Sequence, residues 1–456
     1  MNSMTNENGS SVDQQQAGSY RQSCTLAYPA ILTMISQTVM WTVDSAMVGH
    51  IGKTELAAVG LGGILVFTLY SFFIGLTSAV NTFVAQSFGA GKLRKCGMYL
   101  WQGLYVSLAA AALIYVVRAF APQIVRLLGP DEPVQPLTTA YVHIRMLSAP
   151  FFLIYYTYSH FYRGIGDTKT PLKVLFAAHV VNFVGDYFLI FGKGPFPAMG
   201  VEGAAWATSL ANLVAAAIFF ALTFTRRMRE KYGALSQKRP RPEEIIRLFR
   251  IGLPVALHFF LDMGSFLVFS AYIGRMGTEE LAVNQIAIQI LALSFMPCQG
   301  FAIAATTLMG QYIGAGHPDL AQKSAYTTLK MGLFYAGFIA LLCLTVPEYL
   351  VRIFNSDPTV VHLGRRVLYW AALFQAFDAV QFISSGALRG AGDTRVPMYI
   401  VLGAAWLMFL PLAYVFGTVL ERGVVGAWAG ATLYITATGV MMFLRLKTER
   451  WRRIRI

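Results

Sequence analysis

The chain has 456 residues, of which 56% are hydrophobic and only 13% are charged. A soluble domain carries about 25% charged residues, so this composition excludes an ordinary soluble fold and indicates a membrane protein. The net charge of +14 would suggest nucleic acid binding in a soluble protein, but here the basic residues gather at the ends of apolar segments.

Twelve apolar segments predict twelve membrane-spanning helices. Each is long enough to cross the hydrocarbon core, which needs roughly 20 mostly apolar residues. Apolar length and the placement of Gly, Pro and charge put them at residues 26–49, 59–87, 97–117, 137–161, 171–191, 203–225, 251–273, 283–312, 325–346, 363–388, 397–417 and 424–444. The fold class is therefore all-α integral membrane.

Polar segments divide this chain into parts. Residues 1–20 predict a disordered N-terminal tail. Residues 226–250 predict a basic cytoplasmic linker between a first bundle of six helices, 21–225, and a second bundle, 251–445. A basic C-terminal tail, 446–456, follows. Most of the 36 basic residues fall on one side, which predicts that both termini are cytoplasmic and that the tail meets anionic lipid rather than nucleic acid.

The two bundles repeat each other in sequence. A shift of 225 residues places Pro29 on Pro254, and one residue of slip later RGIGDT falls on RGAGDT, so that Asp167 corresponds to Asp393. Because six helices per repeat is an even number, the repeats share one orientation, and we expect them to be related by an axis along the membrane normal with a cavity between them. In the repeated loops we expect Gly to supply unusual backbone angles and Asp to cap the next helix.

Four acidic residues lie inside predicted spans. An acid in a membrane costs a few kcal/mol, so it is a functional candidate by default. At 1.5 Å per residue, Asp44 and Asp186 both lie roughly 22–27 Å from the cytoplasmic end, and Asp262 and Asp378 both lie roughly 15–16 Å from it. The position equivalent to Asp44 is Phe269, so the repeated scaffold itself needs no acid there. The pattern predicts one acidic pair in each bundle.

Such pairs suit two chemistries, and the residues leave both open. Two carboxylates with amide and hydroxyl oxygens can hold Na⁺. Equally, one of two neighbouring buried carboxyl groups can carry a proton near neutral pH. For any single acid, the alternative is hydrogen-bonded packing. No cofactor besides H⁺ or Na⁺ is expected. Further candidates, for contact with a substrate, are Gln37, Met40, Trp41, His179, His258, Gln285, Gln289 and Gln375.

Several stretches together resemble one known family. They are VDSAMVGHIG, ELAAVGL, VAQSFGAG, FYRGIGDTKTPL, NFVGDYFLIFG, MGVEGAAWAT, GLPVALHFFLDM, ELAVNQIAIQ, LMGQYIGAG and ALRGAGDTRVP. The chain resembles the multidrug and toxic compound extrusion (MATE) transporters. The resemblance implies a monomeric, two-lobed antiporter of the bacterial or archaeal inner membrane. It would exchange hydrophobic or cationic small molecules for H⁺ or Na⁺ by a rocker-switch mechanism, with a bend of the first helix near Pro29 or within the SQT stretch at 36–38.

The resemblance also implies roles for the acids of the first bundle. Asp44 resembles the first-helix acid of the cation site in the DinF-like branch, and Asn182 and Asp186 resemble its fifth-helix partners. Thr208 resembles the sixth-helix hydroxyl ligand of that site. A sodium ion would then bind at Asp44, Asn182 and Asp186.

The second bundle resembles the NorM-like branch less closely. Asp262 lies where NorM-like members carry a glutamate, and Asp378 resembles the aspartate of the second bundle in that branch. The matches in the first bundle need no substitution, so the DinF-like branch is favoured.

Other functions have less support in the sequence. A flippase for lipid-linked precursors shares this architecture, but it should line its cavity with basic residues, and Arg145 is nearly the only base in the middle of a span. A membrane enzyme would need a metal or nucleophile motif such as H-E-x-x-H, which the chain lacks. A channel is disfavoured only by the repeat, which is typical of alternating access.

Overall fold

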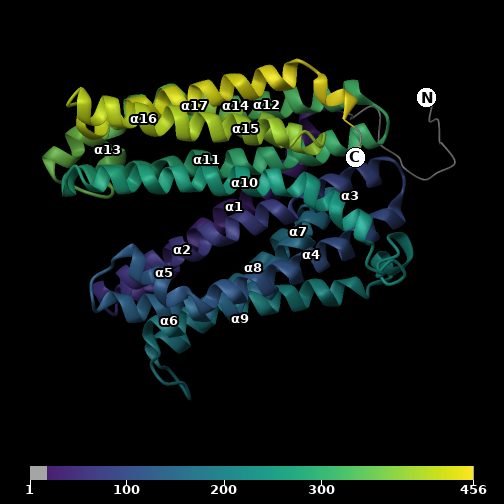
Figure 1. Cartoon of the computed structure of the whole chain (residues 1–456), viewed down its shortest axis with the longest axis horizontal. Coiled ribbons are helices and arrows are strands. Elements are labelled where there is room, and N and C mark those ends of the chain that lie inside the picture. The colour runs from purple at the N-terminus through teal and green to yellow at the C-terminus, as the bar shows by residue number, and fades with distance from the viewer. Residues whose placement is uncertain (1–17, 455) are drawn as a thin grey trace. The chain divides into compact units, whose positions relative to one another are not determined.

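The computed structural model describes residues 18–454 and 456, and these form helices with no strand among them (Figure 1). The predicted disordered tail lies almost wholly outside the described residues. The α-helices are α1 (Tyr20–Gly49), α2 (Lys53–Thr77), α3 (Ala79–Gly89), α4 (Leu93–Ala119), α5 (Ala121–Leu128), α6 (Val134–Leu147), α7 (Ala149–Gly164), α8 (Lys169–Phe191), α9 (Gly200–Thr223), α10 (Pro242–Gly274), α11 (Thr278–Gly314), α12 (Pro318–Thr345), α13 (Pro347–Arg352), α14 (Pro358–Gly390), α15 (Arg395–Ala404), α16 (Leu410–Tyr414) and α17 (Gly423–Lys447). The π-helices are η1 (Arg227–Lys231), η2 (Ala405–Phe409) and η3 (Val415–Val419), and η4 (Arg450–Arg453) is a 3₁₀-helix.

The membrane spans agree with the prediction. Within the described residues, eleven helices are long and apolar enough to cross a membrane, and α6 with α7 form a bent pair that makes up the twelfth. The fold class is thus confirmed. The largest difference in position is the seventh span, expected from residue 251 but starting at Pro242. Hydropathy detects only the apolar part of a helix, and the first turns of α10 are polar.

The helices form two compact units. We call Ile35–Phe88 with Lys92–Ala256 the N-lobe, and the first part of α1, Gly89–Gly91 and Leu257–Ile456 the C-lobe. The boundaries fall inside two helices, α1 and α10, whereas the sequence-based bundles divide at the linker. The start of α1 therefore packs with the C-lobe, and the start of α10 packs with the N-lobe.

Equivalent glycines bring these helix starts into close contact within each lobe. A Cβ at Gly75 of α2 would lie 2.6 Å from Cα of Ala256 in α10. A Cβ at Gly300 of α11 would lie 2.8 Å from N and 2.9 Å from Cα of Ile31 in α1. The repeat shift carries Gly75 to Gly300 and Ile31 to Ala256, so both lobes use the same crossing. A side chain at either glycine would push the two backbones apart.

The repeated RGxGDT loops have the predicted backbone. Gly166 and Gly392 have φ of 84° and 86°, a left-handed conformation that favours glycine. Asp167 caps α8, because its Oδ1 accepts from the backbone N–H of Thr170 at 3.0 Å. Both aspartates also form ion pairs, Asp167 with Arg227 at 3.2 Å and Asp393 with Arg445 at 2.7 Å. The capping role is confirmed in the first loop, while the second aspartate is held by the end of α17.

The basic linker is bound to one face of α4. Gln102, which is fully buried, accepts from the Arg241 amide at 2.8 Å and donates to the Arg239 carbonyl at 3.1 Å. Trp101 and Tyr105 donate to further linker carbonyls. The linker therefore belongs to the folded N-lobe.

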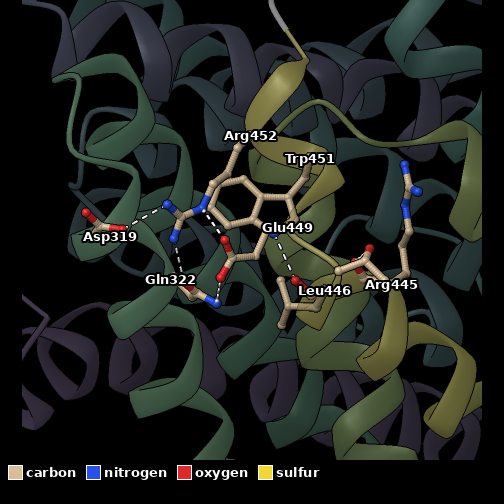
Figure 2. A network of polar contacts seen from close by, with 8 residues as sticks. Asp319, Gln322, Arg445, Leu446, Glu449, Trp451 and Arg452 are labelled. Carbon is tan, nitrogen blue, oxygen red and sulfur yellow. Dashed lines mark hydrogen bonds and ion pairs between the residues drawn. The ribbon is translucent and has the colours of Figure 1, made fainter.

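The C-terminal tail docks on the C-lobe through a polar network (Figure 2). Arg452 pairs with Asp319 at 2.9 Å and with Glu449 at 3.2 Å, and it donates to Gln322 at 2.6 Å. Beside it Trp451 is buried and donates to the Leu446 carbonyl at 2.9 Å. The tail's remaining bases include Lys447, Arg450 and Arg453, which are exposed. The expected contact of the tail with anionic lipid stays a prediction, and it concerns these exposed bases rather than Arg452.

Candidate functional site

Two predicted acids meet in the N-lobe. Asp44 lies on α1, and Asn182 and Asp186 lie one turn apart on α8. The Asn182 amide donates to Asp186 Oδ2 at 2.6 Å and to Asp44 Oδ1 at 3.4 Å. The two carboxyl groups are also close enough to interact directly. We call Asp44 and Asp186 the N-lobe acid pair. Their predicted proximity is confirmed.

One oxygen of this pair has no partner. Asp186 is fully buried, and its Oδ1 has no hydrogen-bond partner among the described residues. Two ionised carboxylates in a medium of low dielectric repel each other strongly, and an unpaired buried oxygen costs free energy. A proton or a small cation between the carboxyl groups would relieve both costs. The geometry therefore suits reversible binding of a monovalent cation.

Other side chains predicted for the first bundle have contacts of their own. Thr208 donates to the Ala204 carbonyl of its own helix at 2.9 Å, and its role as an ion ligand stays a prediction. Gln37 donates to the Tyr156 hydroxyl at 3.3 Å. Trp41 is 48% exposed, and its ring lies 6.4 Å from that of Phe67.

Met40 and His179 complete the first-bundle candidates, and both are only partly buried. His179 lies on α8 one turn before Asn182. Its Nε2 has no hydrogen-bond partner among the described residues. It is thus available for a further contact beside the acid pair.

The C-lobe acids are arranged around a tyrosine. Asp262 lies on α10, Asp378 on α14 and Tyr434 on α17, and α14 and α17 run side by side (Figure 1). The Tyr434 hydroxyl donates to Asp262 Oδ1 at 2.9 Å. Asp262 and Asp378 interact electrostatically, as predicted from their depth. The Tyr434 ring stacks on Phe409 with centroids 4.9 Å apart, which fixes its direction.

The amides around the C-lobe acids are also engaged. Gln375 is fully buried and accepts from Ser294 at 2.6 Å, and Gln381 accepts from Thr438 at 2.6 Å. These contacts hold α14 against α11 and α17. The candidates Gln285, Gln289 and His258 are placed differently: both glutamines are exposed, and the histidine is buried with its ring 5.7 Å from that of Phe259.

Sequence reasoning missed three residues that act on the acids. Tyr434 contacts Asp262, and Tyr141 and Arg145 of α6 act electrostatically on the N-lobe acid pair. The signal for Arg145 was present, because it is a rare base in the middle of a span. No signal of comparable strength marks Tyr434, since depth counting does not say which helices are neighbours.

The family follows from a comparison with known sequences. A family model described as MatE matches residues 29–188 and 254–415, which is most of the chain. The chain belongs to the multidrug and toxic compound extrusion (MATE) family.

Relatives of this MATE family member cover nearly its whole length. Multidrug resistance protein MdtK of Yersinia pseudotuberculosis serotype O:1b (strain IP 31758) is 31% identical over 431 residues, which are 92% of this chain and 94% of that protein. The protein of the same name from Yersinia enterocolitica serotype O:8 has the same identity and coverage. The chain is thus a multi-pass membrane protein of a transporter family.

Solved MATE structures share the fold. The eukaryotic MATE transporter AtDTX14 has a TM-score of 0.85 at 20% identity, covering 95% of this chain and 96% of that one. An outward-facing multidrug resistance MATE transporter has a TM-score of 0.86 at 21% identity, covering 94% and 95%. A MATE protein in a bent conformation has a TM-score of 0.87 at 19% identity, covering 98% of both chains.

Proposed function

We propose that this protein is a secondary active exporter of organic, mostly cationic compounds, which it exchanges for H⁺ or Na⁺. Family membership supports transport, and relatives of nearly full length are named multidrug resistance proteins. The two repeated lobes support a rocker-switch mechanism, since such repeats are typical of alternating access. We place the protein in the plasma membrane of a bacterium or archaeon with both termini in the cytoplasm, and we expect it to act as a monomer.

The observation that carries the proposal is the N-lobe acid pair. Two carboxyl groups share the amide of Asn182, and the buried Oδ1 of Asp186 is left without a partner. In the mechanism, H⁺ or Na⁺ binds at Asp44, Asn182 and Asp186, with Thr208 as a further ligand. Binding neutralises the pair and so weakens its attraction for a cationic substrate. The ion drives export only through its different affinity for the two conformations.

The first helix connects the site to the conformational change. α1 is continuous through Pro29, which has no N–H to donate to the carbonyl one turn earlier, and the Pro29 carbonyl accepts from the Thr33 hydroxyl at 2.7 Å. A proline inside a helix removes one backbone hydrogen bond, so this turn bends at lower cost than its neighbours. We propose that α1 bends here when the coupling ion binds at Asp44.

The arrangement of the N-lobe also favours the DinF-like branch. The C-lobe acids would then have a supporting role, because Asp262 is already engaged by Tyr434. A flippase for lipid-linked precursors is less supported, since a pyrophosphate group would meet two carboxyl groups with Arg145 as their neighbouring base.

The test is export of ethidium, a fluorescent monovalent cation, from proteoliposomes under separately imposed H⁺ and Na⁺ gradients. We expect Asp44→Asn to reduce ion-driven export about 100-fold, because it removes a charged ligand of the coupling ion. The matched C-lobe variant Asp378→Asn should keep most of it. Normal export by Asp44→Asn under both gradients would show that the N-lobe acid pair is not the coupling site.

A further inference from the structure

The fourth span is broken close to the N-lobe acid pair. α6 ends at Leu147 and α7 begins at Ala149, with a bend of 52° between them. Pro150 lies in the first turn of α7. Arg145 lies in the last turn of α6, where a positive charge also offsets the partial negative charge of the helix C-terminus. An exposed arginine could make this interaction with the helix end equally well, so it does not explain why Nε and Nη1 of Arg145 are buried.

Helix register places Arg145 at the depth of the acids. Tyr141, one turn before Arg145 on the same face of α6, packs in one cluster with Val48 of α1 and Ile190 of α8. Val48 and Ile190 each follow a member of the N-lobe acid pair by one turn. α6 runs in the opposite direction to α1 and α8. A residue one turn after Tyr141 on α6 therefore lies at the same depth as residues one turn before Val48 and Ile190, which are the two acids. Arg145 accordingly acts electrostatically on both of them.

The guanidinium of Arg145 has few contacts of its own. Its Nε and Nη1 are buried and have no hydrogen-bond partner among the described residues. A guanidinium keeps its charge in proteins and is costly to bury without an opposite charge. The backbone carbonyl of Arg145 is held by the Tyr70 hydroxyl at 2.7 Å, which fixes this end of α6. No direct ion pair joins Arg145 to either acid among the described residues, and the opposite charges that act on the guanidinium through space are those of the acid pair.

We propose that Arg145 is a tethered counter-cation that sets how much charge the N-lobe acid pair exchanges in each transport cycle. Two ionised carboxylates and one guanidinium carry a single net negative charge. One H⁺, one Na⁺ or one monovalent substrate cation then neutralises the site completely. Arg145 thereby weakens the binding of the coupling ion enough for release, and it limits the site to one monovalent ion. This inference rests on the proposed function.

Few titratable groups lie near the N-lobe acid pair and Arg145, so the net charge of the site depends mainly on these three residues. Besides the acid pair and Arg145, the titratable groups within residues 18–454 that act on the site are Tyr141 on α6 and, through Arg145, Tyr70 on α2. His179 lies one turn before Asn182 on α8. The proposal depends on the fixed charge of the guanidinium and not on the titration of these groups.

The first test uses the unaltered protein in proteoliposomes loaded with ethidium. One coupling ion should leave the exchange electroneutral, so the rate should not respond to a membrane potential imposed with K⁺ and valinomycin. A rate that rises with the potential, with two ions moved per ethidium, would overturn the proposal without any variant.

The second test compares Arg145→Gln with Arg145→Lys. Without the charge, the coupling ion should bind at least tenfold more tightly, the maximal export rate should fall, and export should become sensitive to membrane potential. The lysine variant should stay within about threefold of the unaltered protein, since its ammonium group also carries one positive charge. An unchanged ion affinity in Arg145→Gln, or the same shift in both variants, would contradict the proposal.

Different results would contradict the proposed coupling site and the proposed role of Arg145. If Asp44→Asn exports ethidium normally, the proposed coupling site is wrong and the role of Arg145 falls with it. If Asp44→Asn is inactive while Arg145→Gln keeps the ion affinity of the unaltered protein, only the counter-cation role is wrong. Thermal unfolding of each variant in detergent shows whether a loss of export reflects a loss of fold.

Discussion

In the N-lobe one amide donates hydrogen bonds to two carboxyl groups, whereas in the C-lobe a phenol donates a hydrogen bond to one carboxyl group. Asn182 donates to both acids and leaves Asp186 Oδ1 unpaired, while Tyr434 donates to Asp262 from a ring stacked on Phe409. The two sites occupy non-equivalent positions on a repeated scaffold. The difference separates a site open to a further cation from a site whose acid already has a fixed donor.

The largest expected effect comes from removing the Asn182 amide, which the two acids of the N-lobe acid pair share. Asn182→Leu takes a hydrogen bond from each carboxyl group of the N-lobe acid pair, and bonds to charged groups contribute about 1.5–3 kcal/mol each. We expect ion-driven ethidium export to fall about 100-fold. The matched control is Gln381→Leu, a buried amide of the C-lobe. An equal loss in the control would mean that the lobes do not differ in this respect.

The second comparison concerns the ion pairs of the RGxGDT loops. Asp393 and Arg445 are 4% and 18% exposed, whereas Asp167 and Arg227 are 17% and 56% exposed. Arg445→Gln should lower the free energy of unfolding by about 3 kcal/mol, because it leaves a buried carboxylate unpaired. Arg227→Gln should cost less than about 1 kcal/mol, since water screens that pair.

Thermal unfolding in detergent measures both variants. Adding Asp393→Asn to Arg445→Gln removes the unpaired charge and should restore more than half of the lost stability. If Arg227→Gln costs as much as Arg445→Gln, burial is not what distinguishes the two loops.

The smallest expected effect comes from the C-lobe phenol. Tyr434→Phe keeps the ring on Phe409 and removes only the hydrogen bond to Asp262, so we expect a loss of about 1–2 kcal/mol in the free energy of unfolding. Ion-driven export should change less than about threefold. A loss of export as large as that of Asn182→Leu would instead assign the coupling ion to the C-lobe.

The sequence was sufficient for the spans and for matching each acid with its partner. Apolar length and a rise of 1.5 Å per residue predict that Asp44 and Asp186 share one depth, as do Asp262 and Asp378, because both quantities run along the helix axis. The lateral arrangement of helices was not predictable in this way. Tyr434 was therefore missed, since only the packing of α17 against α10 and α14 brings its hydroxyl to Asp262.

The break in the fourth span was also missed. Residues 137–161 were predicted as one helix, but Pro150 in the first turn of α7 has no backbone N–H to continue the hydrogen bonding of α6, and the chain bends between α6 and α7. The division of α1 and α10 between the lobes follows from close contacts at Gly75 and Gly300, which one-dimensional patterns do not contain.

The ion pairs of the two loops use arginines from non-equivalent positions of the repeat. The shift that takes Asp167 to Asp393 takes Arg227 to Arg453, yet Arg453 is exposed and the pair is made by Arg445, eight positions earlier in the chain. The two loops therefore keep equivalent aspartates but pair them with arginines from non-equivalent positions. A repeated scaffold can thus keep an interaction while its partner comes from elsewhere in the chain, so a comparison of the two lobes should match partners in space before positions in sequence.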